Sequence, residues 1–128
     1  MANGLTGFDH IVLAVDEVSA TVEFYQRVLG MTPVEHMPGK WALRFGDHKI
    51  SLQPADHRPP MAIGTTPGSG NFCVLTDEPV DEVAGRLRTL GIAIESGPVE
   101  KVGATGPIMS VYFRDPDGNL VEVANLIG

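Results

Sequence analysis

Two side chains in this sequence, His10 and Glu122, have the chemistry of metal ligands or of an acid–base pair. An internal repeat relates each of them to a second polar residue: His10 corresponds to Asn71, 61 positions later, and Ser51 corresponds to Glu122. Imidazole and carboxylate groups that converge from several strands can hold a divalent ion and leave positions open for an oxygen-bearing substrate. The amide of Asn71 and the hydroxyl of Ser51 are weaker donors, so only half of this set of four is strong.

The repeat itself is visible in residues 10–30 and 71–91, which follow one pattern. In each copy an apolar run ends in Asp-Glu, an amphipathic stretch follows, and Leu-Gly closes it. The matching pairs are Asp16 with Asp77, Glu17 with Glu78, Leu29 with Leu90 and Gly30 with Gly91. A duplicated unit that builds one domain places its functional site between the two copies. We therefore expect a groove between two modules.

The first copy predicts a strand, a helix and two further strands. Apolar residues recur at helical spacing after residue 17, with Asp16 or Ser19 as the cap and Gly30 as the stop. The expected strands are residues 8–15, 41–45 and 49–53.

The second copy repeats this order. Pro79 suits the first turn of its helix, where the missing amide costs nothing, and Gly91 ends that helix. Residues 115–119, Asp-Pro-Asp-Gly-Asn, predict a tight turn, and residues 97–107 predict a mobile loop. The expected strands are residues 71–76, 92–95, 108–113 and 120–124.

These elements predict an α+β fold of two tandem β-α-β-β-β modules in a single domain, residues 1–128. Module one covers residues 7–53, a Pro- and Gly-rich linker covers 54–70, and module two covers 71–127. One helix covers one face of each curved mixed sheet, or half-barrel.

Strand alternation predicts which side chains face the groove, because the more apolar set of each strand packs under the helix. The polar residues of the opposite set are His10, Arg44, Ser51, Gln53, Asn71, Ser110, Tyr112 and Glu122, together with Cys73. Alternation assigns Trp41 to the helix side, but its indole, like the ring of Tyr112, has the shape to stack on a planar ligand.

Composition limits the classes of function. Hydrophobic residues make up 43% and charged residues 20% of the chain, which is typical of a globular domain. The net charge of −7 disfavours nucleic acid as a partner and is compatible with a cationic ligand. No apolar run is long enough to span a membrane. The single cysteine, Cys73, fits a reducing, cytoplasmic setting.

Three segments carry a family resemblance: Phe8-Asp-His-Ile-Val-Leu-Ala-Val15, Phe24-Tyr-Gln-Arg-Val-Leu-Gly30 and residues 112–122, Tyr-Phe-Arg-Asp-Pro-Asp-Gly-Asn-Leu-Val-Glu. The chain resembles the vicinal oxygen chelate superfamily, which includes glyoxalase I, extradiol dioxygenases and the fosfomycin- and bleomycin-resistance proteins. The resemblance implies a homodimer, a ligand contact at Tyr112, and divalent metal at the positions of His10 and Glu122. Zinc, nickel, manganese or iron would then need Gln53 or Asn71 as a third ligand.

Two functions follow from these residues. In the first, the chain sequesters a drug-like or natural-product ligand in the groove, in the manner of bleomycin-resistance proteins. In the alternative, it is a divalent-metal-dependent lyase, isomerase or dioxygenase, with His10, Glu122 and Tyr112 as candidate catalytic residues. Acid–base catalysis by His10 and Glu122 without metal is a third possibility.

Overall fold

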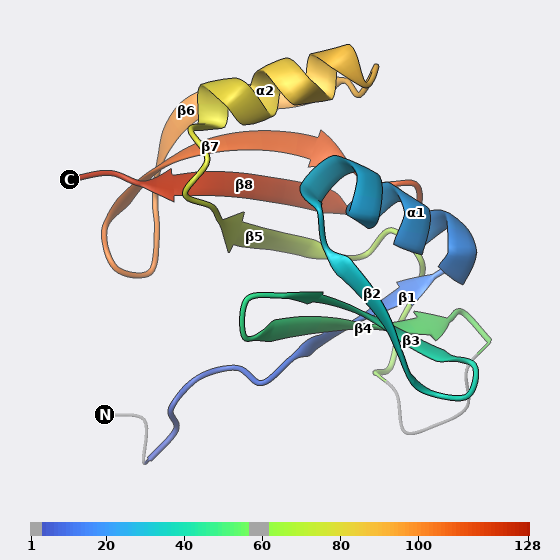
Figure 1. Cartoon of the computed structure of the whole chain (residues 1–128). Helices are drawn as coiled ribbons and strands as arrows, with labels where there is room; N and C mark the ends of the chain where they lie inside the picture. The colour runs from blue at the N-terminus through green and yellow to red at the C-terminus, as the bar shows by residue number, and fades with distance from the viewer. Residues whose placement is uncertain (1–3, 57–61) are drawn as a thin grey trace. The chain divides into compact units, whose positions relative to one another are not determined.

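The computed structural model describes residues 4–56 and 62–128 (Figure 1). They form two compact units, Met1–Thr66 and Pro67–Gly128, and each unit is described here by itself. The last residues of the predicted linker, from Pro67 onward, group with the second unit. Residues 57–61 of that linker, which include His57, lie outside the described residues.

The first unit is a four-stranded mixed sheet with one helix. Its elements are β1 (Ile11–Val15), α1 (Val18–Leu29), β2 (Thr32–Met37), β3 (Lys40–Phe45) and β4 (His48–Pro54). The strand order is β1-β4-β3-β2, in which β1 and β4 are parallel and the other pairs antiparallel.

The second unit repeats this arrangement. Its elements are β5 (Asn71–Leu75), α2 (Val80–Thr89), β6 (Ile94–Val102), β7 (Pro107–Arg114) and β8 (Leu120–Leu126). The order is β5-β8-β7-β6, again with one parallel pair, β5 and β8. The predicted α+β fold of two β-α-β-β-β modules is confirmed, and neither sheet closes into a barrel.

Each helix packs on one face of its own sheet, as α2 does over β6, β7 and β8 in Figure 1. The core of the second unit lies in this layer, where Leu87, Val111, Phe113 and Val121 are fully buried. Within each unit, the described residues place no helix on the opposite face of the sheet. We call it the helix-free face.

The first helix ends at the residue predicted from the sequence, but its start differs from the prediction. Gly30 ends α1 with φ = 67°, the left-handed conformation that favours glycine. The N-cap position is held by Glu17 rather than by the predicted Asp16 or Ser19, and the side chain of Glu17 makes no capping hydrogen bond. Ser19 lies inside the first turn, and its hydroxyl instead donates to Oε1 of Glu17 at 3.4 Å.

The predicted loop over residues 97–107 is also wrong, because β6 continues to Val102. Its pairing with β7 shifts register between Ser96 and Val99, so the strand bulges around a Gly-Pro sequence that alone resembles a turn. Gly97 has φ = 101°, and a Cβ there would lie 2.2 Å from the carbonyl oxygen of Ser110. Only glycine allows this close approach of β6 to β7.

The predicted turn at residues 115–119 is present and fixes the start of β5. The buried carboxylate of Asp115 accepts hydrogen bonds from the amide nitrogens of Asp117 and Asn119, both at 3.0 Å. Oδ1 of Asn119 in turn accepts a 2.6 Å hydrogen bond from the amide of Gly70. The turn between β7 and β8 thereby holds the chain segment that enters β5.

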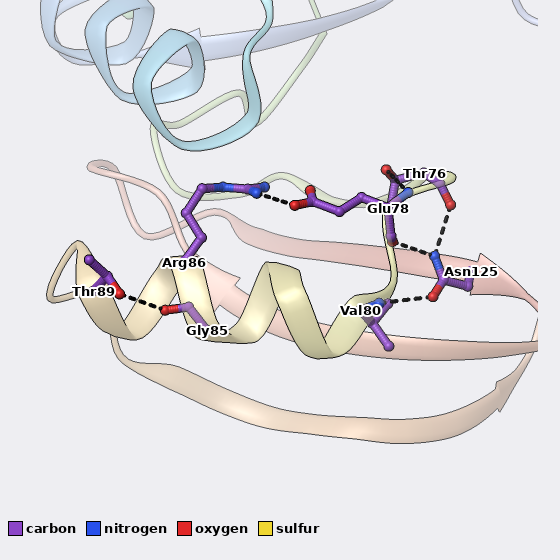
Figure 2. A network of polar contacts seen from close by, with 7 residues as sticks. All are labelled: Thr76, Glu78, Val80, Gly85, Arg86, Thr89 and Asn125. Atoms are coloured by element: carbon purple, nitrogen blue, oxygen red, sulfur yellow. Dashed lines mark hydrogen bonds and ion pairs between the residues drawn. The ribbon is translucent and has the colours of Figure 1, made fainter.

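Asn125 links the end of β8 to the start of α2 (Figure 2). Its Oδ1 accepts a 2.9 Å hydrogen bond from the amide of Val80, in the first turn of the helix. Its Nδ2 donates to the carbonyls of Thr76 and Glu78, both at 2.8 Å. A residue far along the chain therefore satisfies backbone groups that the helix start leaves open. No helix in residues 4–56 and 62–128 is long and apolar enough to span a bilayer.

We expect Asn125→Ala to lower the free energy of unfolding by about 2 kcal/mol, because three backbone groups lose a partner. Asn125→Asp keeps an acceptor for Val80 but sets a carboxylate against two carbonyls, so it should destabilise at least as much. Urea denaturation measures both.

Thr89→Ala is the matched control for Asn125. The Thr89 hydroxyl bonds only the Gly85 carbonyl within the same helix, on an exposed surface (Figure 2), so its loss should cost under about 0.5 kcal/mol. Equal effects of Thr89→Ala and Asn125→Ala would contradict the role given to Asn125.

Candidate functional site

The strand registers define the helix-free faces residue by residue. In the second unit, Glu122 of β8 lies between Cys73 of β5 and Tyr112 of β7. In the first unit, Ser51 of β4 holds the same position, between Val12 of β1 and Ala42 of β3. Ser51 and Glu122 thus occupy matching places in the two sheets.

Glu122 is held by a neighbour on its own face. The fully buried Ser110 hydroxyl donates a hydrogen bond of 2.5 Å to Oε2 of Glu122. Because this donor has no freedom to turn to solvent, it fixes one carboxylate oxygen in place. The absence of a side chain at Gly97 lets β6 lie close to the backbone carbonyl of Ser110.

Two more ionisable groups on this face interact with Glu122. Partial burial, and after it the negative charge of Glu122, raise the pKa of the Cys73 thiol to about 11. Burial and then a hydrogen bond to Glu122 raise the pKa of the Tyr112 hydroxyl to about 12. At neutral pH both groups keep their protons and can act only as neutral donors. Cys73 is therefore a poor nucleophile.

Lys101 of β6 lies on the same face, with Nζ 5.8 Å from the centroid of the Tyr112 ring. The sequence did not point to Lys101 because its segment resembles a loop. Pairing of Lys101 with Ile108, two positions from Ser110, places it here.

In the first unit, His10 lies just before β1 and contacts its neighbour in sequence. Nδ1 of His10 is 2.7 Å from Oδ2 of Asp9, which leaves Nε2 available to a ligand. The hydrogen bond from His10, and after it the charge of His10, lower the pKa of Asp9, and Lys49 lowers it slightly more. Neither Asp9 nor Lys49 was singled out from the sequence, although alternation along β4 already places Lys49 with Ser51.

Other predicted site residues differ in placement. Within residues 4–56 and 62–128, the side chains of Arg44, Ser51, Gln53 and Asn71 have no hydrogen-bond or ion-pair partner, so their polar groups are available. Trp41 differs, because it alternates with Ala42 and so lies on the helix-covered face, away from Ser51.

A pocket of about 580 Å³ in the second unit lies apart from these residues. It is lined by the end of β5, the start of α2 and the end of β8, with Leu75, Asp77, Pro79 and Leu126 among its walls. No residue predicted for the site lines it.

Within the second unit, the donors around Glu122 do not make a set of strong metal ligands. No group of three or more His, Cys, Asp and Glu side chains that could hold one occurs among the residues that the structure describes. Around Glu122, the nearest partners are a serine hydroxyl, a protonated thiol and a phenol, all weak ligands at neutral pH.

The fold and these faces agree with one known family. The model of the Glyoxalase/Bleomycin resistance protein/Dioxygenase superfamily matches residues 7–123. The chain belongs to this superfamily, which confirms the resemblance to vicinal oxygen chelate proteins. The superfamily includes both binding proteins and enzymes, so membership alone does not choose between them.

Individual proteins resemble the chain over nearly its whole length. Virulence protein STM3117 of Salmonella typhimurium is 44% identical over 120 residues, 93% of this chain and 83% of that protein. Its crystal structure matches with a TM-score of 0.93 at 43% identity, covering 96% of this chain and 98% of that one.

Two further structures show the breadth of the likeness. A structure from the mobile metagenome of V. pseudocholerae, VPC_CASS1, is 40% identical, with a TM-score of 0.93 and 97% of each chain covered. The antibiotic-binding protein TnmS3 from Streptomyces sp. CB03234 is 21% identical, with a TM-score of 0.76 over 97% of this chain and 98% of that one. At this identity, the likeness of TnmS3 to this chain shows a common fold and nothing more.

The contact between Cys73 and Glu122 predicts how fast the thiol is alkylated. Glu122→Gln removes the negative charge but not the burial, so the pKa of Cys73 should fall part of the way towards its ordinary value. The thiolate fraction at pH 8.5, and the rate with iodoacetamide, should then rise roughly three- to tenfold. Mass spectrometry over a pH series measures this rate.

Glu100→Gln is the matched control, since it removes the same charge from an exposed position of β6 on the helix-covered side. It should leave the rate unchanged. A Glu122→Gln protein that reacts no faster than the wild type would contradict the contact.

Proposed function

We propose that the chain binds a small organic molecule of the drug or natural-product kind on its helix-free faces and releases it unchanged. One observation supports this most directly. The faces carry several polar side chains that have no partner among the described residues, Arg44, Ser51, Gln53 and Asn71, but only one imidazole and one carboxylate at the positions that the repeat relates. Such a face suits hydrogen bonding to an organic ligand better than holding a catalytic metal.

The sheets add the apolar surface that such a ligand needs. Val12, next to Ser51, is 44% exposed, and Leu120, beside Asn71, is partly exposed. A mixture of apolar surface and a few unpaired polar groups is typical of small-molecule sites. The superfamily includes bleomycin resistance proteins, and TnmS3 is an antibiotic-binding protein, so this function is known on the same fold.

The second candidate is enzymatic, and the contact between Asp9 and His10 favours it. A carboxylate on Nδ1 fixes the imidazole tautomer and leaves Nε2 as a base. Two assays test for turnover: methylglyoxal with glutathione after nickel is added, and catechol with oxygen after iron is added. Turnover that Glu122→Ala abolishes would favour this candidate over binding alone.

The test of the binding function uses metal-free bleomycin as the probe and protein treated with EDTA. We expect calorimetry to detect binding, mass spectrometry to recover the bleomycin unchanged, and elemental analysis of protein purified without chelator to find well under one metal per chain. Arg44→Ala and Asn71→Ala should each weaken binding roughly three- to tenfold, since each removes a hydrogen-bonding group.

Arg27→Ala is the matched control for Arg44→Ala. Arg27 carries the same charge, but it lies on α1 and pairs with Glu23 at 2.8 Å, so bleomycin affinity should not change. Retention of one metal per chain that is lost in both His10→Ala and Glu122→Ala would defeat the proposed function.

We also propose a cytoplasmic homodimer, which the superfamily resemblance and the single cysteine suggest. Multi-angle light scattering should give twice the monomer mass at micromolar concentration. A monomer mass over the whole concentration range would contradict the dimer.

A further inference from the structure

We infer that the Glu122 carboxylate, held by Ser110 and flanked by Cys73 and Tyr112, binds an amine or guanidine group of the ligand in place of a metal ion. This inference rests on the proposed function and specifies the chemical class of the molecule that is bound. It follows from the geometry around Glu122, from the balance of charge there, and from the surface on which Glu122 lies.

The geometry holds the carboxylate in a defined orientation. Glu122 sits directly between Cys73 and Tyr112 in the sheet, and the buried Ser110 hydroxyl donates to its Oε2 at 2.5 Å. A carboxylate offers about four lone-pair positions on its two oxygens. These neighbours therefore leave acceptor positions for a donor from outside, and the fixed Oε2 means that little ordering is needed when a ligand binds.

The charge at this place is unbalanced. Cys73, Ser110 and Tyr112 contribute neutral X–H groups, and no Lys, Arg or His side chain forms an ion pair with Glu122 within the described ranges 4–56 and 62–128. A half-buried carboxylate without a countercharge is costly, and a single positive charge compensates it. A divalent ion would need further anionic or imidazole ligands, which this sheet does not supply next to Glu122.

The surrounding surface suits an organic cation better than a hydrated one. Leu120 and Ala124, two residues before and after Glu122, lie on the same face, and Val99 pairs with Ser110. The partly exposed side chains of Leu120 and Val99 can contact the carbon skeleton of a ligand whose charged end meets the carboxylate, whereas Ala124 is fully buried. The net charge of −7 attracts cations to the whole chain.

Lys101, a cation on the same face of this sheet, contacts the ring of Tyr112. Nζ of Lys101 lies over the Tyr112 ring, 5.8 Å from its centroid, rather than in an ion pair with Glu122. Among the residues that the structure describes, the ring thus has a cation beside it and the Glu122 carboxylate has no ion-pair partner, which leaves its charge for a cationic ligand.

The experiment compares two probes with the same naphthylmethyl skeleton, 2-naphthylmethylamine, a cation at neutral pH, and the uncharged 2-naphthylmethanol. EDTA-treated protein is titrated with each, and NMR follows the amide signals of Cys73, Tyr112 and Glu122. We expect the amine to bind roughly tenfold more tightly than the alcohol, and the preference to shrink between 50 mM and 500 mM KCl.

Three variants locate the preference. Glu122→Gln should abolish it, whereas Glu100→Gln, which removes the same charge on the helix-covered side, should keep it. Ser110→Ala keeps the charge but frees the carboxylate, so the preference should fall to roughly threefold. Thermal unfolding of each variant shows whether it is folded. If Ser110→Ala does not fold, the comparison of Glu122→Gln with Glu100→Gln still tests the inference with the same two probes.

Several results would overturn the inference: equal binding of the two probes, an equal loss of preference in Glu100→Gln, or no binding of either probe. Retention of a stoichiometric metal ion that Glu122→Gln abolishes would overturn it as well. If metal-free bleomycin binds while the naphthyl probes show no charge preference, this inference fails and the binding function stands. If bleomycin does not bind either, both fail.

Discussion

The packing of a single helix on one face of each sheet is the constraint on which the rest of this structure depends. It buries alternate residues of the central strands, such as Val121 and Val123 of β8, and leaves Glu122 between them on the other face. Polar chemistry on the helix-free face can then vary without loss of the core. The repeat copies this division, and so Ser51 and Glu122 hold matching positions with different side chains.

The two units have used this freedom in opposite ways. The helix-free face of the first unit carries Arg44 and Lys49, which lie opposite each other on β3 and β4, beside the neutral Ser51. In the second unit the carboxylate of Glu122 lies next to the neutral donors Ser110, Cys73 and Tyr112, and Lys101 lies over the Tyr112 ring. The two matching positions therefore carry side chains of different charge and hydrogen-bonding character.

Much of this arrangement could be predicted from the sequence. Periodicity gave the helices, Gly30 marked the end of α1, and alternation with the repeat assigned Ser51 and Glu122 to one kind of face. Local sequence patterns failed to predict strands that form only because they pair with a neighbouring strand. β2 (Thr32–Met37) is largely exposed and lacks an apolar pattern, and the Gly-Pro sequence in β6 resembles a loop although the strand continues.

The contacts between side chains were harder to foresee. The bond from Ser110 to Glu122 depends on the register between β7 and β8, and the position of Lys101 depends on the bulge in β6. The contact between Asp9 and His10 joins neighbours in sequence, yet its geometry follows from the path of the chain before β1. Spacing along a sequence does not fix these features.

The central claim, that the helix-free faces bind the ligand, is tested most directly by NOEs between bound, metal-free bleomycin and methyl groups of the protein. Val12 and Leu120 lie on helix-free faces, whereas Leu13 and Val121, their neighbours in sequence, point into the cores and are at most 5% exposed. The account predicts NOEs from the ligand to Val12 or Leu120 and none to Leu13 or Val121. Bound bleomycin whose NOEs avoid both Val12 and Leu120 would contradict it.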